Sequence, residues 1–374
     1  MAKNKSGLSR DFIIHPGETL KEILEDRGMS QRELALRTDV TESHISSVVN
    51  CQKDISVTFA KKLEYALGID ARFWINLQAN YDKELADFEE LNEILSEEHE
   101  IVKKLHSIVE HFKGIGLLER EAHGSTLVVH LRKLLNVSNL TRIPEVSQTG
   151  AYRLATDANV DPYVLFTWLR MCDLIVKDLQ IEQKLDIDII KDKIPLLKEL
   201  MFEEDVGVIQ SRLRDYLAEC GIKFSIVKHF TGAPVQGVIK KNDDGTLNLL
   251  LTTRPKFADV FWFTLFHELG HIINGDIGDR LIDYDFAKGE AEDRANEFAA
   301  NILIDKEKYD SFVRKGDFSL FSIKQFCSEQ GIPSYILIGR LQRDEHLGYN
   351  QYSSEKVRYQ LEDPNLYSYT LPTI

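Results

Sequence analysis

The hydrophobic pattern of this chain changes near residue 222, and this change limits the fold more than any other feature. Up to about residue 200, apolar residues recur mostly at helical spacing. Three β-like runs then follow, at residues 223–230, 235–240 and 247–252. A turn signal, Asn242 to Gly245, separates the last two runs, and two long helical patterns come after them, at about 258–273 and 290–303. The pattern predicts an all-α N-terminal part and an α+β C-terminal part.

Length and composition predict several domains and no membrane partner. At roughly 100–200 residues per domain, 374 residues predict two or three domains. No apolar run reaches the ~18 residues that a transmembrane helix needs, and the polar start, residues 1–7, lacks the core of a signal peptide. The four cysteines lie far apart, which argues against a disulfide framework and against a zinc knuckle. We therefore expect a cytoplasmic protein.

Charge is unevenly spread along the chain. The formal net charge is −14, which is a poor signature for nucleic-acid binding. Residues 1–82 carry 11 Lys and Arg against 12 Asp and Glu, whereas the remaining residues carry 35 against 48. Phosphate would repel this larger part. We therefore expect only the N-terminal segment to meet DNA, through a local basic face.

Residues 30–50 have the pattern of two short capped helices joined by a turn. Ser30 and Thr41 are the expected N-caps, Glu33 stands at the capping-box position, and Asp39 lies in the turn. Such a unit inserts its second helix into the major groove of DNA, N-terminal residues first. The residues expected to face base edges are Thr41, Glu42, Ser43 and Ser47. Those expected to meet or attract phosphate are Ser30, Gln31, Arg32, Arg37 and Lys53. The alternative is a small helical bundle used for protein contacts.

This segment resembles the HigA-type antitoxins within the phage-repressor class of helix-turn-helix proteins. The resemblance covers residues 15–82 and is most specific in the string FWINLQANYD, from Phe73 to Asp82. It implies binding to operator DNA, usually as a homodimer, and often a toxin partner. The family usually has Gly where this chain has Cys51. A left-handed backbone costs more at Cys than at Gly, so we expect this departure to affect the local loop but not the fold.

A second motif, His267-Glu268-Leu269-Gly270-His271, lies in the first of the two long helical patterns. The i, i+4 spacing places both imidazoles on one face of a helix, where they can bind one metal ion. Glu268 lies beside that face and can take a proton from metal-bound water. The alternative is a buried helix that carries two incidental histidines.

The second long helical pattern offers the third ligand that a catalytic zinc needs. Glu292 can complete a His-His-Glu set, and Asn296, one turn later, can orient a ligand imidazole. Glu290 and Asp293 are competing ligand candidates. Two histidines with one carboxylate suit Zn²⁺ best, at one ion per chain. The same set also suits non-haem iron, but Glu268 favours hydrolysis.

Residues 195–345 resemble the ImmA/IrrE family of metallo-endopeptidases. The resemblance rests on residues 261–272, FWFTLFHELGHI, and on Glu292-x-x-Ala295-Asn296-x-Phe298-Ala299. It implies a minimal zincin fold, His267, His271 and Glu292 as zinc ligands, and Glu268 as the catalytic base. It also implies a repressor-like protein substrate, cleaved after stress or during mobile-element induction. Many members have a further His after the second ligand, where this chain has Asn274 and Asp276.

Three other residues near the second motif are candidates for minor roles. Tyr284 or Arg294 could stabilise an oxyanion. His229, on a β-like run, could contact the substrate. None of these roles has further support in the sequence.

Together these observations predict a multi-domain chain. The expected parts are a mobile tail (1–12), an all-α helix-turn-helix domain (13–82), a helical connector (83–194), an α+β minimal zincin peptidase (195–345) and a loosely ordered C-terminal tail (346–374). The predicted function is a DNA-binding regulator with a zinc endopeptidase that cleaves itself or a repressor-like partner. The alternatives are a non-proteolytic regulator whose zincin domain is a ligand sensor and an antitoxin whose C-terminal part binds a toxin.

Overall fold

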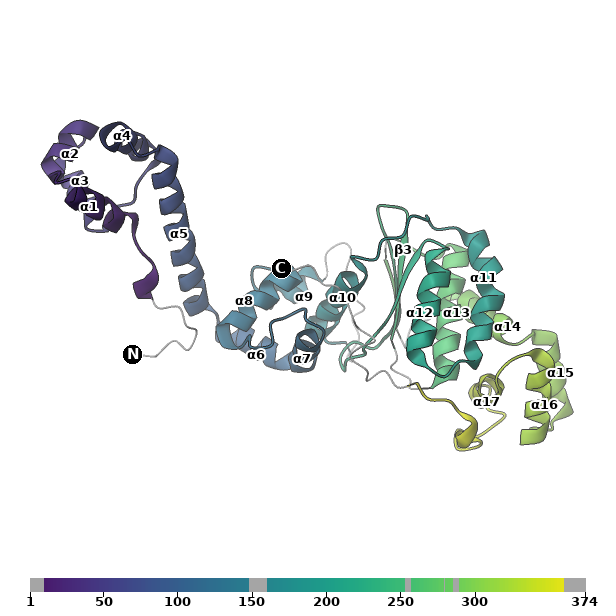
Figure 1. The fold of residues 1–374 in the computed structure, drawn as a ribbon. Coiled ribbons are helices and arrows are strands. Elements are labelled where there is room, and N and C mark those ends of the chain that lie inside the picture. The colour runs from purple at the N-terminus through teal and green to yellow at the C-terminus, as the bar shows by residue number, and fades with distance from the viewer. Residues whose placement is uncertain (1–9, 148–159, 253–256, 279, 285–288, 360–374) are drawn as a thin grey trace. The chain divides into compact units, whose positions relative to one another are not determined.

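The computed structural model describes residues 10–147, 160–252, 257–278, 280–284 and 289–359. The chain forms two compact units, one from residues 1–100 and 122–134, the other from residues 101–121 and 135–374. Figure 1 shows the predicted fold class: a helical N-terminal region, a helical middle region and an α+β region with a four-stranded sheet. The predicted connector is divided between the two units and does not form a third.

The first unit begins with a bundle of five helices. After a short 3-10 helix (Arg10–Phe12) come α1 (Pro16–Asp26), α2 (Gln31–Thr38), α3 (Glu42–Val49), α4 (Val57–Leu67) and α5 (Ala71–Glu93). Their apolar faces enclose a small core in which Leu34, Ile45 and Trp74 are fully buried. The buried core comes from apolar residues at helical spacing, as the sequence predicted.

The bundle keeps its short helices in place through local capping. Ser30 Oγ accepts a hydrogen bond from Glu33 N at 3.1 Å, and Thr41 Oγ1 accepts one from His44 N at 3.2 Å. The Glu33 carboxylate does not complete a capping box, because it pairs with Arg37 at 2.7 Å instead. Asp39 ends α2 in a left-handed conformation, with φ 49°. Cys51, just after α3, is also left-handed, with φ 59°, in the loop where the family usually has Gly.

A buried ion pair ties two further helices to the long helix α5. Glu98, fully buried on α6 (Ser96–Lys104), accepts hydrogen bonds from Arg132 on α8 (Gly124–Leu135). Arg132 also donates to Glu90 of α5 at 2.7 Å. The stretch from Lys83 to Glu100 is strongly acidic, and one of its carboxylates, that of Glu98, is enclosed and paired.

The second unit holds the sheet. Its helices before the first strand are α7 (His106–Gly114), the short α9 (Ile143–Val146), α10 (Pro162–Val176), α11 (Ile187–Glu199) and α12 (Val206–Ala218). The strands are β1 (Ile222–Val227), β2 (Val235–Lys241), β3 (Leu247–Thr252) and β4 (Arg280–Tyr284). The remaining helices are α13 (Ala258–Asn274), α14 (Glu290–Leu303), α15 (Lys306–Lys315), α16 (Leu320–Gln330) and α17 (Ser334–Arg343). Short 3-10 helices lie at Leu140–Arg142, Leu200–Phe202 and Ser353–Glu355.

The sheet has the strand order β1-β3-β2-β4 and is mixed. Strands β1 and β3 are parallel, whereas β2 is antiparallel to both β3 and β4. The predicted hairpin between β2 and β3 is confirmed, with Gly245 left-handed at φ 84°. The sequence reading missed β4, a five-residue strand at the edge of the sheet.

Helices cover both faces of this sheet, and β2 shows how alternate residues divide between them. Gly237 lies against Glu268 of α13, whereas Lys240 pairs with Asp173 of α10 at 3.0 Å. Successive side chains of a strand point to opposite faces, and the odd spacing of these two residues fits that rule. Helix α13 therefore packs on one face of the sheet at β2, and α10 packs on the opposite face.

The second unit differs from the predicted boundaries at both ends of the zincin region. Its core begins no later than Ile190, and residue 195 lies inside α11, so a domain start at 195 would divide a helix. The expectation of a loose tail after Tyr349 is wrong as far as Tyr359. Tyr359 is only 4% exposed and accepts a hydrogen bond from Trp262 Nε1 at 2.8 Å. Residues 360–374 lie outside the described residues.

Candidate metal centre and helix-turn-helix

Helix α13 brings the two histidines of the second motif together inside the protein. His267 is 5% exposed and His271 is fully buried. Their Nε2 atoms lie 3.0 Å apart, as the i, i+4 spacing on one helical face requires. Two imidazole nitrogens that face each other at this distance leave room for one shared metal ion or proton.

Helix α14 supplies a carboxylate to the same point. Glu292 Oε2 lies 3.1 Å from His267 Nε2 and 3.5 Å from His271 Nε2. The possible ligand atoms of all three residues lie within 4.8 Å of one another. The competing candidates, Glu290 and Asp293, are both exposed on the outer side of the helix. The buried His-His-Glu group fits a metal ion in its donor types and its geometry.

Close packing of the two helices makes this meeting possible. A Cβ atom added at Gly270 would lie 3.2 Å from Ala295 Cα and 3.1 Å from the Phe298 ring. Gly270 of α13 and the fully buried Ala295 of α14 thus allow the backbones to approach closely. Gly270 stands between the two histidines, and Ala295 stands between Glu292 and Asn296, so the motifs encode both the ligands and the helix contact.

Outer residues lie beside both imidazoles, and one of them is within hydrogen-bond distance. Asn296 Oδ1 lies 3.2 Å from His267 Nδ1, the position predicted for it. Asp276 Oδ2 lies 3.7 Å from His271 Nδ1, and Arg294 donates to the other oxygen of Asp276 at 2.5 Å. The sequence reading did not assign a role to Asp276, although an acidic residue soon after the second histidine was a usable signal. Arg294 is therefore paired with Asp276.

The electrostatics of the centre favour unprotonated histidine. Burial lowers the pKa of His267 below its ordinary value, and the neighbouring His271 lowers it further, against the opposing effect of Glu292. A neutral imidazole is the form that binds a metal ion. The protein thus disfavours the protonated state that would compete with metal.

Glu268 is fully buried and lies against the backbone of β2. A Cβ atom at Gly237 would come within 2.0 Å of Glu268 Oε1, so only glycine leaves space for this carboxyl group. The sequence reading missed Gly237. An isolated glycine in a β-like run is a signal of close approach by another group, and here the group is the side chain of Glu268.

The structure gives no support to the roles suggested for His229, as a substrate contact, and Tyr284, as an oxyanion stabiliser. His229 lies in the loop after β1. The side chain of Tyr284 lies outside the described residues.

In the first unit, the candidate DNA-contacting residues gather around α2 and α3. Ser30, Arg37, Thr41, Glu42 and Ser43 are exposed, whereas Gln31 and Ser47 are half-buried. Two of these side chains are already engaged: Ser47 Oγ donates to Ser43 O at 2.9 Å, and Arg37 pairs with Glu33.

Two lysines bring positive charge to α3 and to the turn before it. Lys53 Nζ lies 2.9 Å from His44 Nδ1 on α3, and Lys62 Nζ donates to Asp39 O in the turn at 2.9 Å. Partial burial lowers the pKa of His44, and Lys53 and Lys62 lower it further. The sequence reading included Lys53 but missed Lys62, because Lys62 comes from α4 and only the tertiary structure places it at the turn.

Comparison with known proteins finds a family for each of the two regions. The helix-turn-helix family model matches residues 20–74, and a model described as the IrrE N-terminal-like domain, a peptidase family, matches residues 244–326. Virulence-associated protein I of Dichelobacter nodosus is 39% identical over 75 residues, which are 20% of this chain and 69% of that protein. The chain belongs to the helix-turn-helix family. Its C-terminal half carries the IrrE-like peptidase domain.

Further similarities concern the same N-terminal region. Virulence-associated protein A′ of Dichelobacter nodosus is 39% identical over 69 residues, which are 18% of this chain and 60% of that protein. An antidote protein of a plasmid maintenance system from Nostoc punctiforme is 33% identical, covering 22% of this chain and 97% of its own, with a TM-score of 0.20. An addiction module antidote protein of a HigA family from Coxiella burnetii is 28% identical, covering 26% and 90%, with a TM-score of 0.19.

The described part of the chain contains no candidate transmembrane helix. None of its helices combines the length and the apolar character needed to cross a bilayer.

Proposed function

We propose that this protein is a DNA-binding regulator whose C-terminal domain is a zinc metallo-endopeptidase acting on a regulatory protein, either this chain or a repressor-like partner. The observation that carries the proposal is the buried convergence of His267, His271 and Glu292, with Glu268 enclosed beside them. The match to an IrrE-like peptidase domain supports the same reaction class.

Zinc is the metal we propose, at one ion per chain. Two histidines and one carboxylate are a common catalytic zinc set, and three protein ligands leave a fourth position for water or substrate. When bound, the ion would lower the pKa of that water and polarise the scissile carbonyl. His267, His271 and Glu292 would hold it, while Asn296 would fix the orientation of the His267 ring.

Glu268 would provide the general base. Its carboxylate would accept the proton of the attacking water and pass it to the leaving amine. Gly237 would allow the carboxylate to occupy this position, because a glycine leaves space for it against β2. Cleavage would then need no nucleophile from the chain itself.

The N-terminal domain would direct the peptidase to operator DNA. We propose that α3 enters the major groove, so that Thr41, Glu42, Ser43 and Ser47 face base edges. Phosphate contacts would come from Ser30, Gln31 and Arg37, with added charge from the lysines beside α3. The domain would bind as a homodimer, and a protein that binds operator DNA would work in the cytoplasm.

The decisive experiment compares cells that carry wild-type protein with cells that carry Glu268→Gln, after stress. Mass spectrometry of their proteins should find cleavage products that occur only with wild-type protein. The control is His267→Ala, which should also lack the products but, unlike Glu268→Gln, should lose its metal. If the Glu268→Gln cells accumulate the same products as wild type, the peptidase proposal is wrong.

A second candidate function is a non-proteolytic regulator whose zincin domain senses a ligand or binds a toxin. The resemblance of residues 15–82 to HigA-type antitoxins favours the toxin form of this candidate. The enclosed Glu268 argues against it, because binding a toxin or a ligand requires no buried general base. Co-purification of a small toxin with both wild-type protein and Glu268→Gln, without any cleavage, would favour this second candidate.

A further inference from the structure

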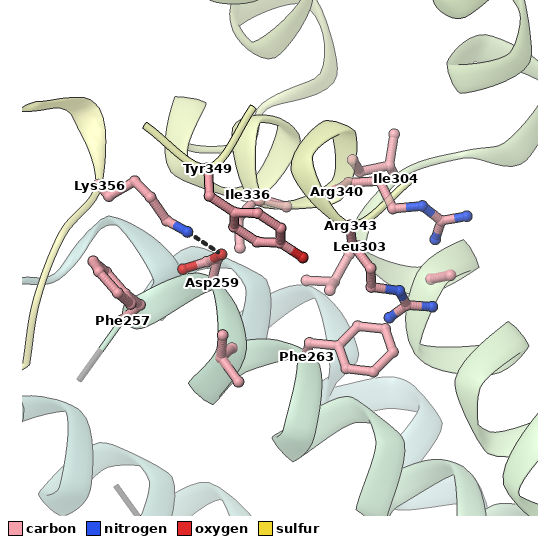
Figure 2. Close-up of a pocket in the computed structure, with 13 residues that line it drawn as sticks. Phe257, Asp259, Phe263, Leu303, Ile304, Ile336, Arg340, Arg343, Tyr349 and Lys356 are labelled. Carbon is pink, nitrogen blue, oxygen red and sulfur yellow. Dashed lines mark ion pairs between the residues drawn. The ribbon is translucent and has the colours of Figure 1, made fainter. Parts of the chain in front are cut away.

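A cavity lies in the second unit beside the metal centre but outside it. Its volume is about 300 Å³, and its walls come from α13, α14, α17 and the segment between Tyr349 and Lys356. Figure 2 shows these walls, with Phe263 on one side and Tyr349 lying over the space. None of the three metal-ligand candidates lines it. A volume of this size is at the lower end of the range for small-molecule sites.

The walls of the cavity are mainly apolar. The apolar lining residues include Val260, Phe263, Leu303, Ile304 and Ile336. Most of them are branched aliphatic side chains. Contact with an apolar body would remove this surface from water, which is favourable in proportion to the area buried. The walls therefore suit the hydrocarbon part of a ligand.

Charged residues also line the cavity, and two of the three cations already have partners. Lys356 pairs with Asp259 at 3.0 Å, and both side chains are about 10% exposed. Arg340 pairs with Asp344 at 2.6 Å. Each of these two ion pairs has no net charge, so neither of them favours a charged ligand.

Arg343 is different. Its guanidinium lies over the Phe263 ring, 4.4 Å from the ring centroid, and it makes no ion pair with any residue in the described part of the chain. Partial burial lowers the pKa of Arg343, and the neighbouring Arg340 lowers it further, against the opposing effect of Asp344, which is already paired with Arg340. In Figure 2 the side chain stands at the Phe263 end of the cavity. This end therefore presents one positive charge that an anion would stabilise.

We propose that this cavity binds a small monocarboxylate with an aliphatic body. The carboxylate would meet the fork of Arg343, which can bind it in a bidentate manner, and the aliphatic body would fill the space between α13, α14 and α17. A single cation that makes no ion pair among the described residues fits a single negative charge better than a phosphate dianion. The site is independent of the proposed peptidase chemistry, since it shares no residue with the ligand set.

The site nevertheless touches both helices of the metal centre. Phe263 stands one turn before His267 on α13, with ring centroids 6.3 Å apart, and Ala300 stands one turn after Asn296 on α14. A bound ligand would therefore brace the two helices that carry the metal ligands. Binding itself, however, does not need the metal.

The test is isothermal titration calorimetry of full-length protein with octanoate and with 1-octanol, which has the same length but no charge. Octanoate should bind wild-type protein at least about tenfold more tightly than 1-octanol, because a charge-assisted pair adds to the apolar contact. Arg343→Gln should reduce this preference to near unity by weakening octanoate alone. The control Arg314→Gln, on the exposed last turn of α15, should leave both affinities unchanged.

Two further variants separate this site from the metal centre. Val260→Trp should fill the cavity and weaken both ligands, with circular dichroism to verify the fold. His267→Ala should bind octanoate as wild type does, even though it loses the metal. The proposal is overturned if wild-type protein does not bind octanoate, if it binds both ligands equally, or if Arg343→Gln weakens both alike.

Discussion

The helix-turn-helix and the metal centre use the same kind of element, a short helix with a functional face, in opposite ways. In the helix-turn-helix the functional side chains lie at the surface, and the helix is held by caps within three residues of its start. In the metal centre the functional side chains are buried and meet only because α14 packs on α13, about 25 residues away in sequence. The difference teaches that a surface site needs only side chains at fixed spacing along one packed helix, whereas a metal site needs two helices in fixed register.

The largest expected effects come from the metal centre. His267→Ala should abolish both metal and cleavage, because the remaining histidine and Glu292 cannot close the ligand set. Glu268→Gln should keep close to one zinc per chain while cleavage falls by about 10²- to 10⁴-fold, the usual contribution of a general base. Plasma mass spectrometry would measure the metal in both variants. Equal metal loss in Glu268→Gln and His267→Ala would contradict the roles given to these residues.

Gly237→Ala tests whether β2 positions the base. The new Cβ would stand 2.0 Å from Glu268 Oε1, so the carboxyl group must move while the metal ligands stay. We expect cleavage to fall by about 10²-fold, as for other small misplacements of a catalytic group, with normal metal content. The control is Gly278→Ala, because nothing lies within 4 Å of a Cβ there. Wild-type activity in Gly237→Ala would mean that the position of Glu268 is not set by β2.

Asn296→Leu tests the outer contact to the His267 ring. Loss of the hydrogen bond acceptor should weaken zinc binding by about 10- to 100-fold, as is typical for residues that orient a ligand. Competition with a chromophoric chelator would measure the affinity. Asn301→Leu, at an exposed position on the same helix, is the matched control. If both variants bind zinc equally well, Asn296 does not orient the ring.

The smallest effects are expected in the helix-turn-helix, where single contacts act in water. Arg37→Ala should weaken binding to all DNA sequences by a similar factor, about tenfold or less. It should also make the slope of log affinity against log salt concentration shallower by about one. Ser43→Ala should instead change base preference. A gel-shift series on the protein's own promoter, at several salt concentrations, distinguishes the two. Failure of wild-type protein to bind any of that promoter would remove the DNA-binding role.

Glu33 offers a sharper version of the same comparison. Its carboxylate pairs with Arg37 at 2.7 Å and both side chains are about half exposed, so the pair restrains the cation near the expected phosphates. Glu33→Gln should free Arg37 and remove a negative charge, which should strengthen DNA binding by a few-fold. The same gel-shift series measures this. A weaker complex would indicate that Glu33 is needed to orient Arg37.

Much of the local structure could be predicted from the sequence. The caps at Ser30 and Thr41, the helix from Glu290 to Leu303 and the β2–β3 hairpin all follow from short-range patterns, and each is found where it was expected. Edge strand β4 was missed, because its five residues show no clear alternation. The expectation of a loose tail failed for Tyr359, because a polar, Tyr-rich segment can still bury one tyrosine against Trp262.

The sequence by itself determined where both candidate sites lie, since His267, His271 and Glu268 stand at fixed helical spacing and the helix-turn-helix is built from contacts within about 20 residues. Glu292 was already the expected third ligand, and the tertiary structure brings it, and neither Glu290 nor Asp293, to the histidines, because that depends on the rotation of α14 against α13. It also placed Gly237 against Glu268 and Arg343 over the Phe263 ring, with no ion pair to Arg343 among the described residues. These features join elements distant in the chain, and no local pattern records the packing that brings such elements together.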